Sequence, residues 1–370
     1  MKVFYDYQIF DYQDFGVMSR YFADVISHLP ADCQAMVGVM ETHNAYLSSM
    51  GYPLSGTTYN AFLNYRNTSY KKHLFRLHYS RKFGMLGKWD HVRQLNRGFS
   101  ISLLKQGDFD LAHLTYCHDS LLPYLGGKPY VVTVFDMTAE TEACDADLLR
   151  ARHHVISSAA GIITPDEKVR QTVISFYRVS PEKVFTVPPG IDPAPVKFAA
   201  SSPIRAQYMV YVDNRRSQRL FGRLLEAISE LTHAHPNLKL ICLGPAFNKV
   251  EQALIEENRL SDTVVYINAR SQKEVLNIYH HAEACITSDA DAMSILRQYD
   301  VQCSGTPLLL CDGEASNGQR SMLRNLSSRA VLDIAPRDTV LQTTESTACL
   351  TRQQAAQRLA EVYQLILDCR

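Results

Sequence analysis

Short apolar runs of strand length alternate with amphipathic stretches along most of the chain, a rhythm typical of parallel α/β domains. In the first half, the strand-length runs are residues 3–5, 36–39, 111–114, 130–135, 161–164 and 184–187. Amphipathic segments at 18–29 and 167–177 indicate helices, and Asp166 can cap the first turn of the second one. The pattern predicts a doubly wound, Rossmann-like domain over residues 1–187.

The same rhythm restarts in the second half, with strand-length runs at 209–212, 238–243, 264–267, 284–287 and 307–311. Helical patterns lie between them at 220–232, 250–258, 272–281 and 293–303. Residues 188–206 contain five prolines, which remove amide donors and favour extended backbone, as a linker requires. We therefore predict a second Rossmann-like domain over 207–350 and a C-terminal segment, 351–370, with an amphipathic helix at 352–367.

Length and composition agree with two packed domains. The 370 residues exceed a typical single core, and 46% apolar with 21% charged residues is ordinary for a globular protein. In open α/β sheets, ligands bind beyond the carboxyl ends of the strands. We expect an α/β fold of two facing, doubly wound domains, whose two sheets form one cleft suited to a transferase with two substrates.

Net charge limits the partners that the protein can attract, and cysteine usage indicates its cellular compartment. The formal net charge is zero, so attraction to nucleic acid or membrane would have to come from local clusters. The nine cysteines are odd in number and lack a C-x-x-C pair, which indicates reduced thiols of a cytoplasmic protein. The start has no extended apolar segment, and nowhere do 18 apolar residues follow one another, so we expect neither a signal peptide nor a membrane span.

Several segments carry a family pattern in order along the chain. In the first half they are IFDYQDFGVMSRYFADV, HLTYCHDSLLPYL, VVTVFDMT, ITPDEKVR and VFTVPPGID, and in the second half YMVYVDNRRSQRLFGRLLEAI and ITSDADAMSILRQYDVQCSGTPLLL. Together they resemble the retaining GT-B glycosyltransferases of group 1, which include many bacterial mannosyl- and glucosyltransferases of polysaccharide assembly. The resemblance implies a GT-B architecture, a nucleotide-sugar donor, retention of the anomeric configuration, and no metal or other cofactor.

The first of the two later segments suggests a diphosphate site. By resemblance, Gln218 and Arg219 occupy the places where the family binds the donor diphosphate. A permanently charged guanidinium can hold two phosphate oxygens and stabilise a departing diphosphate. Arg215 and Arg216 lie in the same loop and would assist. In the alternative interpretation, these arginines form a solvated surface cluster.

The second of these segments suggests how the rest of the donor is held. Asp300 falls on the second of two family glutamates and would accept hydrogen bonds from the ribose hydroxyls, on a helix near whose start Ser294 is a further donor-site candidate. Ala292 falls on the first glutamate, which in the family contacts the transferred sugar, and Asp289 or Asp291 would substitute only in a reshaped loop. Alternatively, Asp300 is an exposed acid on that helix.

Candidates in the first domain are fewer. Gly16 is what remains of a family glycine pair, with Phe15 in the other place, and a glycine lets a ligand approach the backbone closely. Phe135 replaces a family histidine that contacts the donor sugar, whereas Asp136 beside it remains, and we expect a catalytic role for Asp136. His113, at the end of a predicted strand, is our candidate for the acceptor site.

Metal-binding patterns are weak. The D-x-D triplets Asp145/Asp147 and Asp289/Asp291 suit a hard divalent cation, but the triplet is short and common. The histidines show no zinc-ligand spacing. We therefore expect no metal site.

Residues 64–106 form a basic segment, with ten Lys or Arg against one acid. Five apolar residues in it recur at helical spacing: Trp89, Val92, Leu95, Phe99 and Leu103. Such a segment can rest on an anionic membrane surface beside a lipid-linked acceptor. In a second interpretation, the apolar stripe packs on the first sheet and the cations face water. In a third, the segment forms a charged groove for an anionic saccharide or nucleic acid. No motif of a nucleic-acid-binding module is present, so we expect no nucleic acid as a partner.

Together with the composition, the resemblance implies a cytoplasmic glycosyltransferase, peripheral on the inner face of the membrane if residues 64–106 bind lipid. It would transfer a sugar from a nucleoside diphosphate donor to a saccharide or lipid-linked saccharide, in surface polysaccharide or glycoconjugate assembly. The loss of both family sugar contacts, at Ala292 and Phe135, has two interpretations. Either the donor is a different sugar, or the chain is a catalytically inactive GT-B protein that binds a partner.

Overall fold

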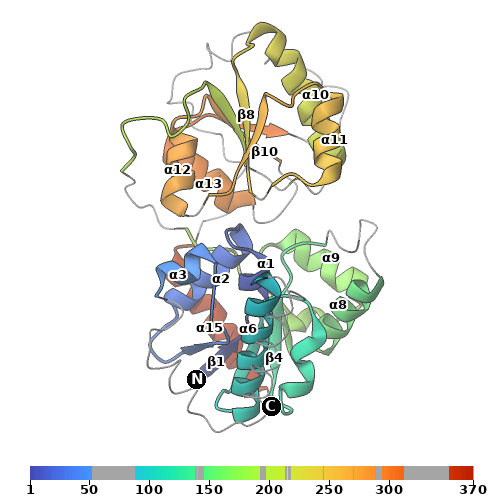
Figure 1. Cartoon of the computed structure of the whole chain (residues 1–370). Helices are drawn as coiled ribbons and strands as arrows, with labels where there is room; N and C mark the ends of the chain where they lie inside the picture. Colours follow the sequence, from blue (N-terminus) through green and yellow to red (C-terminus); the bar gives the residue numbers. More distant parts are fainter. Residues whose placement is uncertain are drawn as a thin grey trace. The chain divides into compact units, whose positions relative to one another are not determined.

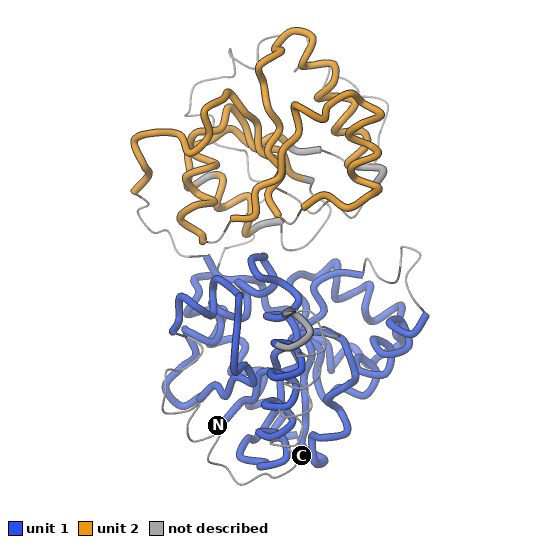
Figure 2. The backbone as a smooth tube through the Cα atoms, in the orientation of Figure 1, with its two compact units in different colours: residues 1–192, 349–370 blue, residues 193–348 orange. Residues whose placement is uncertain are grey.

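The structure is a computed structural model that describes residues 1–51, 88–137, 140, 146–191, 197–212, 215, 218–244, 246–269, 271–288, 294–311 and 350–369. The chain divides into two compact units: residues 1–192 with 349–370 form unit 1, and residues 193–348 form unit 2 (Figure 2). A parallel sheet with helices around it forms the centre of each unit (Figure 1). The prediction of two doubly wound α/β units is confirmed.

The described strands of unit 1 form one parallel sheet in the order β2-β1-β3-β4-β5-β6. They are β1 (Lys2–Tyr5), β2 (Gln34–Val37), β3 (Leu111–Leu114), β4 (Tyr130–Thr133), β5 (Gly161–Thr164) and β6 (Val184–Thr186). Phe4 of β1 lies opposite Met36 on one side and Ala112 on the other. Because the strand order reverses beside β1, the carboxyl ends of β1 and β3 form the point at which such sheets bind ligands.

The helices of unit 1 differ in how far the sequence predicted them. The helices that the structure describes before the chain enters unit 2 are α1 (Gln8–Tyr12), α2 (Val17–Ser27), α3 (Ala45–Ser49), α6 (Lys88–Gln106), η1 (Asp119–Tyr124), α8 (Ala146–Ser158), α9 (Glu167–Tyr177) and η2 (Pro181–Lys183). The predicted cap of α9 is confirmed, because the Asp166 side chain accepts a hydrogen bond of 2.7 Å from the Val169 amide. The sequence did not predict α1 and α3, because five residues are too few to show a helical period.

The last helix, α15 (Arg352–Asp368), lies in unit 1, where it packs beside α2 (Figure 1). Its buried face consists of Ala355, Ala356, Leu359, Ala360, Tyr363 and Ile366. The small alanines at its start allow close packing, and the Tyr363 hydroxyl lies 2.9 Å from that of Tyr5 in β1. The chain thus returns from unit 2 to complete unit 1.

Unit 2 has a parallel sheet in the order β11-β10-β7-β8-β9. Its strands are β7 (Tyr208–Tyr211), β8 (Lys239–Leu243), β9 (Val264–Ile267), β10 (Ala284–Ser288) and β11 (Leu308–Cys311). Its described helices are α10 (Gln218–Ala234), α11 (Lys249–Glu257), α12 (Gln272–His280) and α13 (Ser294–Ser304). The strand order reverses at β7, so the carboxyl ends of β7 and β10 form the corresponding binding edge.

The helical spacing of the apolar residues in α10 explains much of the core of unit 2. Five of its apolar residues recur on one helical face and are buried against the sheet: Phe221, Leu224, Leu225, Ile228 and Leu231. They pack with strand residues that include Met209 and Leu240. This packing fixes the axis of α10 against β7 and β8, and so fixes where the helix begins relative to the binding edge.

Candidate functional site

Helix α10 begins at the two residues that the resemblance assigns to the diphosphate site. Gln218 and Arg219 are the first two residues of this helix, which follows the central strand β7. Helix N-termini present unpaired amides and a partial positive charge, which favour phosphate. The side chains of Gln218 and Arg219 lie outside the described part of the structure, so their contact with phosphate stays a prediction.

Arg215, in the loop between β7 and α10, does not lie in a solvated cluster. Arg215 is 8% exposed, and its Nε donates to Glu251 Oε1 at 3.1 Å. The guanidinium carbon lies 5.0 Å from the centre of the Phe247 ring, and Nη1 lies 3.5 Å from the Leu243 carbonyl oxygen. Arg215 therefore faces the connection from β8 to α11. Arg216 lies outside the described residues.

Asp300 lies on α13 and is 8% exposed, so it is not an exposed acid on that helix. Its Oδ2 accepts a hydrogen bond of 2.7 Å from Gln272 Nε2 at the start of α12. Ser294 begins α13, but its side chain is not described, and Ala292, Asp289 and Asp291 lie outside the described residues. Binding of ribose by Asp300 stays a prediction. The ribose would have to bind a carboxylate that already accepts a hydrogen bond from Gln272.

Asp136 follows β4 in unit 1 and is held through its backbone. Arg152 of α8 donates from Nη2 to the Asp136 carbonyl oxygen at 3.3 Å. The same guanidinium pairs with Glu140, whose Oε1 lies 2.6 Å from Arg152 Nε, and the Tyr177 hydroxyl donates to that oxygen. The side chains of Arg152 and Glu140 are 8% and 0% exposed. A buried ion pair thus holds the segment that carries the predicted catalytic aspartate.

Phe135, at the place of the family histidine, is part of the core. It is 6% exposed, and its ring packs edge-on against Tyr21 and Phe22 of α2, with centroid distances of 5.3 and 5.7 Å. The aromatic ring therefore contributes to the packing of α2 on the sheet. A histidine here would bring a polar ring into this aromatic cluster.

His113 lies inside the sheet of unit 1 and is 0% exposed. Its Nδ1 lies 2.5 Å from the Tyr363 hydroxyl and its Nε2 lies 2.7 Å from the Thr133 hydroxyl. Burial lowers the pKa of His113 to about 3, so the ring is neutral. Both ring nitrogens are occupied by neighbours in the core, and this geometry gives His113 a structural role in docking α15 rather than contact with an acceptor.

Gly16 precedes the first turn of α2 in extended backbone, with φ of −178°. A Cβ built on it would lie 2.4 Å from Gln13 Oε1. The same oxygen accepts a hydrogen bond of 3.0 Å from the Ser19 amide. The close approach at Gly16 is therefore to the Gln13 side chain, which satisfies an amide at the start of α2. Ligand contact at Gly16 stays a prediction.

Two aspartates at the binding edge of unit 1 were missed in the sequence. Asp6, which directly follows β1, is 0% exposed and accepts hydrogen bonds from the Gln8 amide at 2.7 Å and the Thr115 amide at 3.0 Å. Asn96 of α6 donates to Asp11 at 2.8 Å. Burial raises the pKa of Asp6 to about 6 and that of Asp11 to about 7. The position of Asp6 directly after a strand was the available signal.

The free energy of unfolding of unit 1 should fall as pH rises, and we expect Asp11→Asn to make this fall smaller. The unfolded pKa of an aspartate is about 4. The folded protein therefore binds the extra proton between about pH 4 and pH 7, and stability falls as pH rises through this window. One such group changes the free energy of unfolding by up to about 1.4 kcal/mol per pH unit.

The test is urea unfolding at several pH values, with the exposed Asp32→Asn as the matched control. Asn at position 11 can still accept the hydrogen bond from Asn96. Equal pH slopes in wild type and Asp11→Asn would contradict the expectation. Asp6 titrates in an overlapping window, so some slope should persist in the variant.

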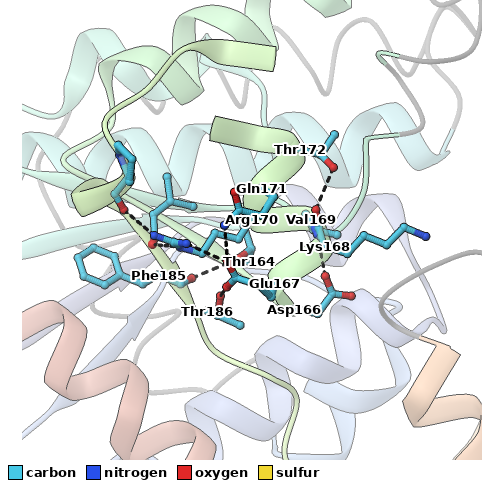
Figure 3. A network of polar contacts seen from close by, with 12 residues as sticks. Thr164, Asp166, Glu167, Lys168, Val169, Arg170, Gln171, Thr172, Phe185 and Thr186 are labelled. Carbon is cyan, nitrogen blue, oxygen red and sulfur yellow. Dashed lines mark hydrogen bonds and ion pairs between the residues drawn. The ribbon is translucent and has the colours of Figure 1, made fainter. Parts of the chain in front are cut away.

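A polar network ties α9 to the last strand of unit 1 (Figure 3). Arg170 donates from Nε to the Val184 carbonyl at 2.9 Å and from Nη2 to the Pro181 carbonyl at 3.1 Å. Its Nη1 lies 2.9 Å from Glu167 Oε1, and Glu167 also accepts from Thr186. The hydrogen bond from Gln171 Nε2 to Glu167, and then that from Arg170, lower the pKa of Glu167. The network anchors β6 directly before the chain leaves unit 1.

The described part of the basic segment turns its apolar stripe inward. Val92, Leu95 and Phe99 of α6 are buried, and the last two pack with Met40. Arg93 and Arg97 are exposed. For this part, the interpretation in which the stripe packs within the first domain holds. Residues 64–87 of the segment lie outside the described residues, and lipid contact stays a prediction.

Within the described ranges, no group of three or more His, Cys, Asp or Glu side chains is placed to hold a metal ion. Of the two D-x-D triplets, only Asp147 lies within these ranges. Among the helices that the structure describes, none is both long and apolar enough to cross a membrane.

Comparison with known proteins gives one family match, and no curated sequence matches the chain. The sequence model of Glycosyltransferase Family 4 matches residues 55–195. This range covers most of unit 1 after its first strands, including Asp136 and the network around α9.

Solved structures match the fold at low sequence identity. WaaG, a glycosyltransferase involved in lipopolysaccharide biosynthesis, has a TM-score of 0.56 and 13% identity, with 100% of this chain and 98% of WaaG covered. S. aureus MnaA, solved with UDP, has a TM-score of 0.54 and 12% identity, with 100% of this chain and 97% of MnaA covered. Sucrose-phosphate synthase from Thermosynechococcus elongatus has a TM-score of 0.52 and 13% identity, with 76% of this chain and 79% of the synthase covered.

The chain spans 57% of the length of S. aureus TarM, which it matches at a TM-score of 0.46 and 11% identity. The structural matches establish the fold, and the sequence match is to a glycosyltransferase family. The chain thus has the GT-B fold of two parallel-sheet units, and its residues 55–195 are similar to a glycosyltransferase family.

Proposed function

We propose that this protein transfers a sugar from a nucleoside diphosphate donor to a saccharide or lipid-linked saccharide acceptor. The observation that carries the proposal is the position of Gln218 and Arg219 at the start of α10, the helix that follows the central strand β7 of unit 2. A departing diphosphate is stabilised by helix amides and a fixed cation, and this helix start can supply both. The Family 4 match supports a transferase rather than another use of the fold.

The proposal includes retention of the anomeric configuration and catalysis without a metal ion, as the resemblance implies. Surface polysaccharide or glycoconjugate assembly is the proposed setting. The match to WaaG supports this setting through the fold alone, and the co-structure of MnaA with UDP supports a uridine nucleotide as the first donor to test.

The test is a thermal-shift screen with UDP, GDP, ADP and CMP and their common sugar conjugates. One nucleoside diphosphate is expected to raise the melting temperature of the wild type, because a ligand at 100 times its Kd stabilises by about 2.7 kcal/mol. Arg219→Ala should lose most of this shift. Arg223→Ala is the matched control, because Arg223 lies one turn further along the same helix.

Two outcomes would contradict parts of the proposal. If no nucleotide shifts the wild type at millimolar concentration, there is no donor site of the proposed kind. If a nucleotide binds but its sugar conjugate is neither hydrolysed nor transferred to any saccharide acceptor, the chain is the catalytically inactive GT-B protein of the alternative interpretation.

A further inference from the structure

The Arg215 side chain spans two loops at the binding edge of unit 2. It starts in the connection from β7 to α10 and ends against the connection from β8 to α11. There, its Nε lies 3.1 Å from Glu251 Oε1, and its guanidinium lies over the Phe247 ring. The side chains of Arg215 and Glu251 are 5% and 9% exposed. A buried guanidinium with a carboxylate partner is strongly tied to that partner.

Glu251 is fixed from its other side as well. Its Oε2 accepts a hydrogen bond of 2.8 Å from the Asn248 amide, and the Asn248 side chain accepts 2.9 Å bonds from the amides of Val250 and Glu251. This reciprocal pattern is a capping box at the start of α11. Glu251 therefore has one oxygen on the helix cap and one on Arg215, so the cap determines where Arg215 is held.

Gly244, directly after β8, lies beside this arrangement. Its φ is +129°, a conformation that residues with a Cβ rarely adopt. A Cβ built there would lie 3.5 Å from Arg215 Nη1. The backbone of the β8–α11 connection thus passes close beside the guanidinium.

We infer that Arg215 is a positioning residue, which holds the β7–α10 connection against the start of α11 and thereby sets the position of the first turn of α10. It does not bind the donor diphosphate itself. Moving the guanidinium from this place to a phosphate at the start of α10 would leave Glu251 as an unpaired buried carboxylate, which is strongly unfavourable. The inference rests on the proposed function, in which the start of α10 binds the diphosphate.

Glu251→Gln separates the two roles of Arg215. Glutamine at the third position of a helix still completes the capping box, so the variant removes the charge and keeps the cap of α11. If Arg215 positions α10, Glu251→Gln weakens binding of the nucleoside diphosphate by about tenfold, a typical coupling for a close pair. If Arg215 is itself a phosphate ligand, Glu251→Gln frees it and binding becomes tighter.

A double-mutant cycle completes the binding test. Calorimetric titration with UDP, or with whichever diphosphate shifts the wild type, is done for Arg215→Met, Glu251→Gln and the double variant. We expect similar losses in both single variants, and a double variant no weaker than either. Loss of binding in Arg215→Met with unchanged or tighter binding in Glu251→Gln would overturn the inference. Arg215→Lys should restore part of the affinity.

Amide hydrogen exchange without ligand tests the positioning independently of the donor. Exchange in the segment from the end of β7 to the first turn of α10 should be faster in Arg215→Met and Glu251→Gln than in wild type. Arg223→Ala, one turn further along α10, should leave it unchanged. Unchanged exchange in both variants of the pair overturns the inference, whereas a wild type that binds no nucleotide but shows this exchange pattern overturns only the proposed function.

Discussion

Gly190→Ala is expected to destabilise unit 1 by about 3 kcal/mol, although the change adds one methyl group. A Cβ built on Gly190 would lie 2.4 Å from Arg352 Cα and 2.6 Å from the Thr351 carbonyl oxygen. These are backbone atoms, so no side-chain rotation can relieve the contact. Directly beside Gly190, the Ile191 amide donates to the Leu350 carbonyl at 2.8 Å, which ties the outgoing chain to the returning one.

The damage should spread to α15. Thr351 caps this helix, with its side chain accepting a hydrogen bond of 3.1 Å from the Gln354 amide. Moving Thr351 and Arg352 to make room for a methyl group disturbs the cap and the docking of Tyr363 on the sheet. Because one change affects a close backbone crossing, a helix cap and a core contact, we expect a large effect for so small a substitution.

Urea unfolding followed by tryptophan fluorescence measures this effect, because the chain's single tryptophan, Trp89, lies in α6 of unit 1. Gly222→Ala is the matched control. It is the same substitution within α10 of unit 2, where an added Cβ meets open space. Alanine in a helix interior is more stable than glycine by up to about 1 kcal/mol, so the control should leave the unfolding midpoint that Trp89 reports unchanged. A Gly190→Ala protein with the wild-type midpoint would contradict the expected clash.

Glu140→Gln is expected to destabilise unit 1 by about 3 kcal/mol or more, because it leaves the buried Arg152 guanidinium without its carboxylate. Arg152 Nε lies 2.6 Å from Glu140 Oε1, and Nη2 lies 3.3 Å from Oε2. Removing one member of a buried ion pair exposes the desolvation cost of the other. The Tyr177 hydroxyl also donates to Glu140, so in the variant Tyr177 loses its carboxylate acceptor as well.

The double variant Glu140→Gln with Arg152→Met is the informative control. Replacing both members of a buried pair is often close to neutral, so the double variant should be more stable than Glu140→Gln alone. The same Trp89 signal measures both. If the single and double variants unfold at the same urea concentration, the ion pair is not what stabilises this region.

The pair also has a consequence for catalysis. Arg152 donates to the backbone carbonyl of Asp136, so loss of Glu140 should loosen the segment that carries the predicted catalytic aspartate. In an active transferase, we expect Glu140→Gln to lower kcat for sugar transfer more than it raises KM for the donor, which binds at the other unit in the proposed function.

The local pattern of the sequence was enough to predict the framework of this protein. Alternating apolar runs and helical periods located the strands of both sheets, and the α9 helix with its Asp166 cap is observed as predicted, since both features depend on residues a few positions apart. The apolar stripe of residues 89–103 correctly indicated a helix, α6, for the same reason. Asp6, directly after β1, could have been found by the same local rule.

Only the tertiary structure decided which faces and partners these elements use. Periodicity shows that Val92, Leu95 and Phe99 share a face, but not that they pack beside Met40 rather than face a membrane. His113 meets Tyr363, which is 250 positions away, and Arg215 meets Glu251, which is 36 positions away. Such pairings depend on how distant segments come together in space, and a local pattern contains no record of that.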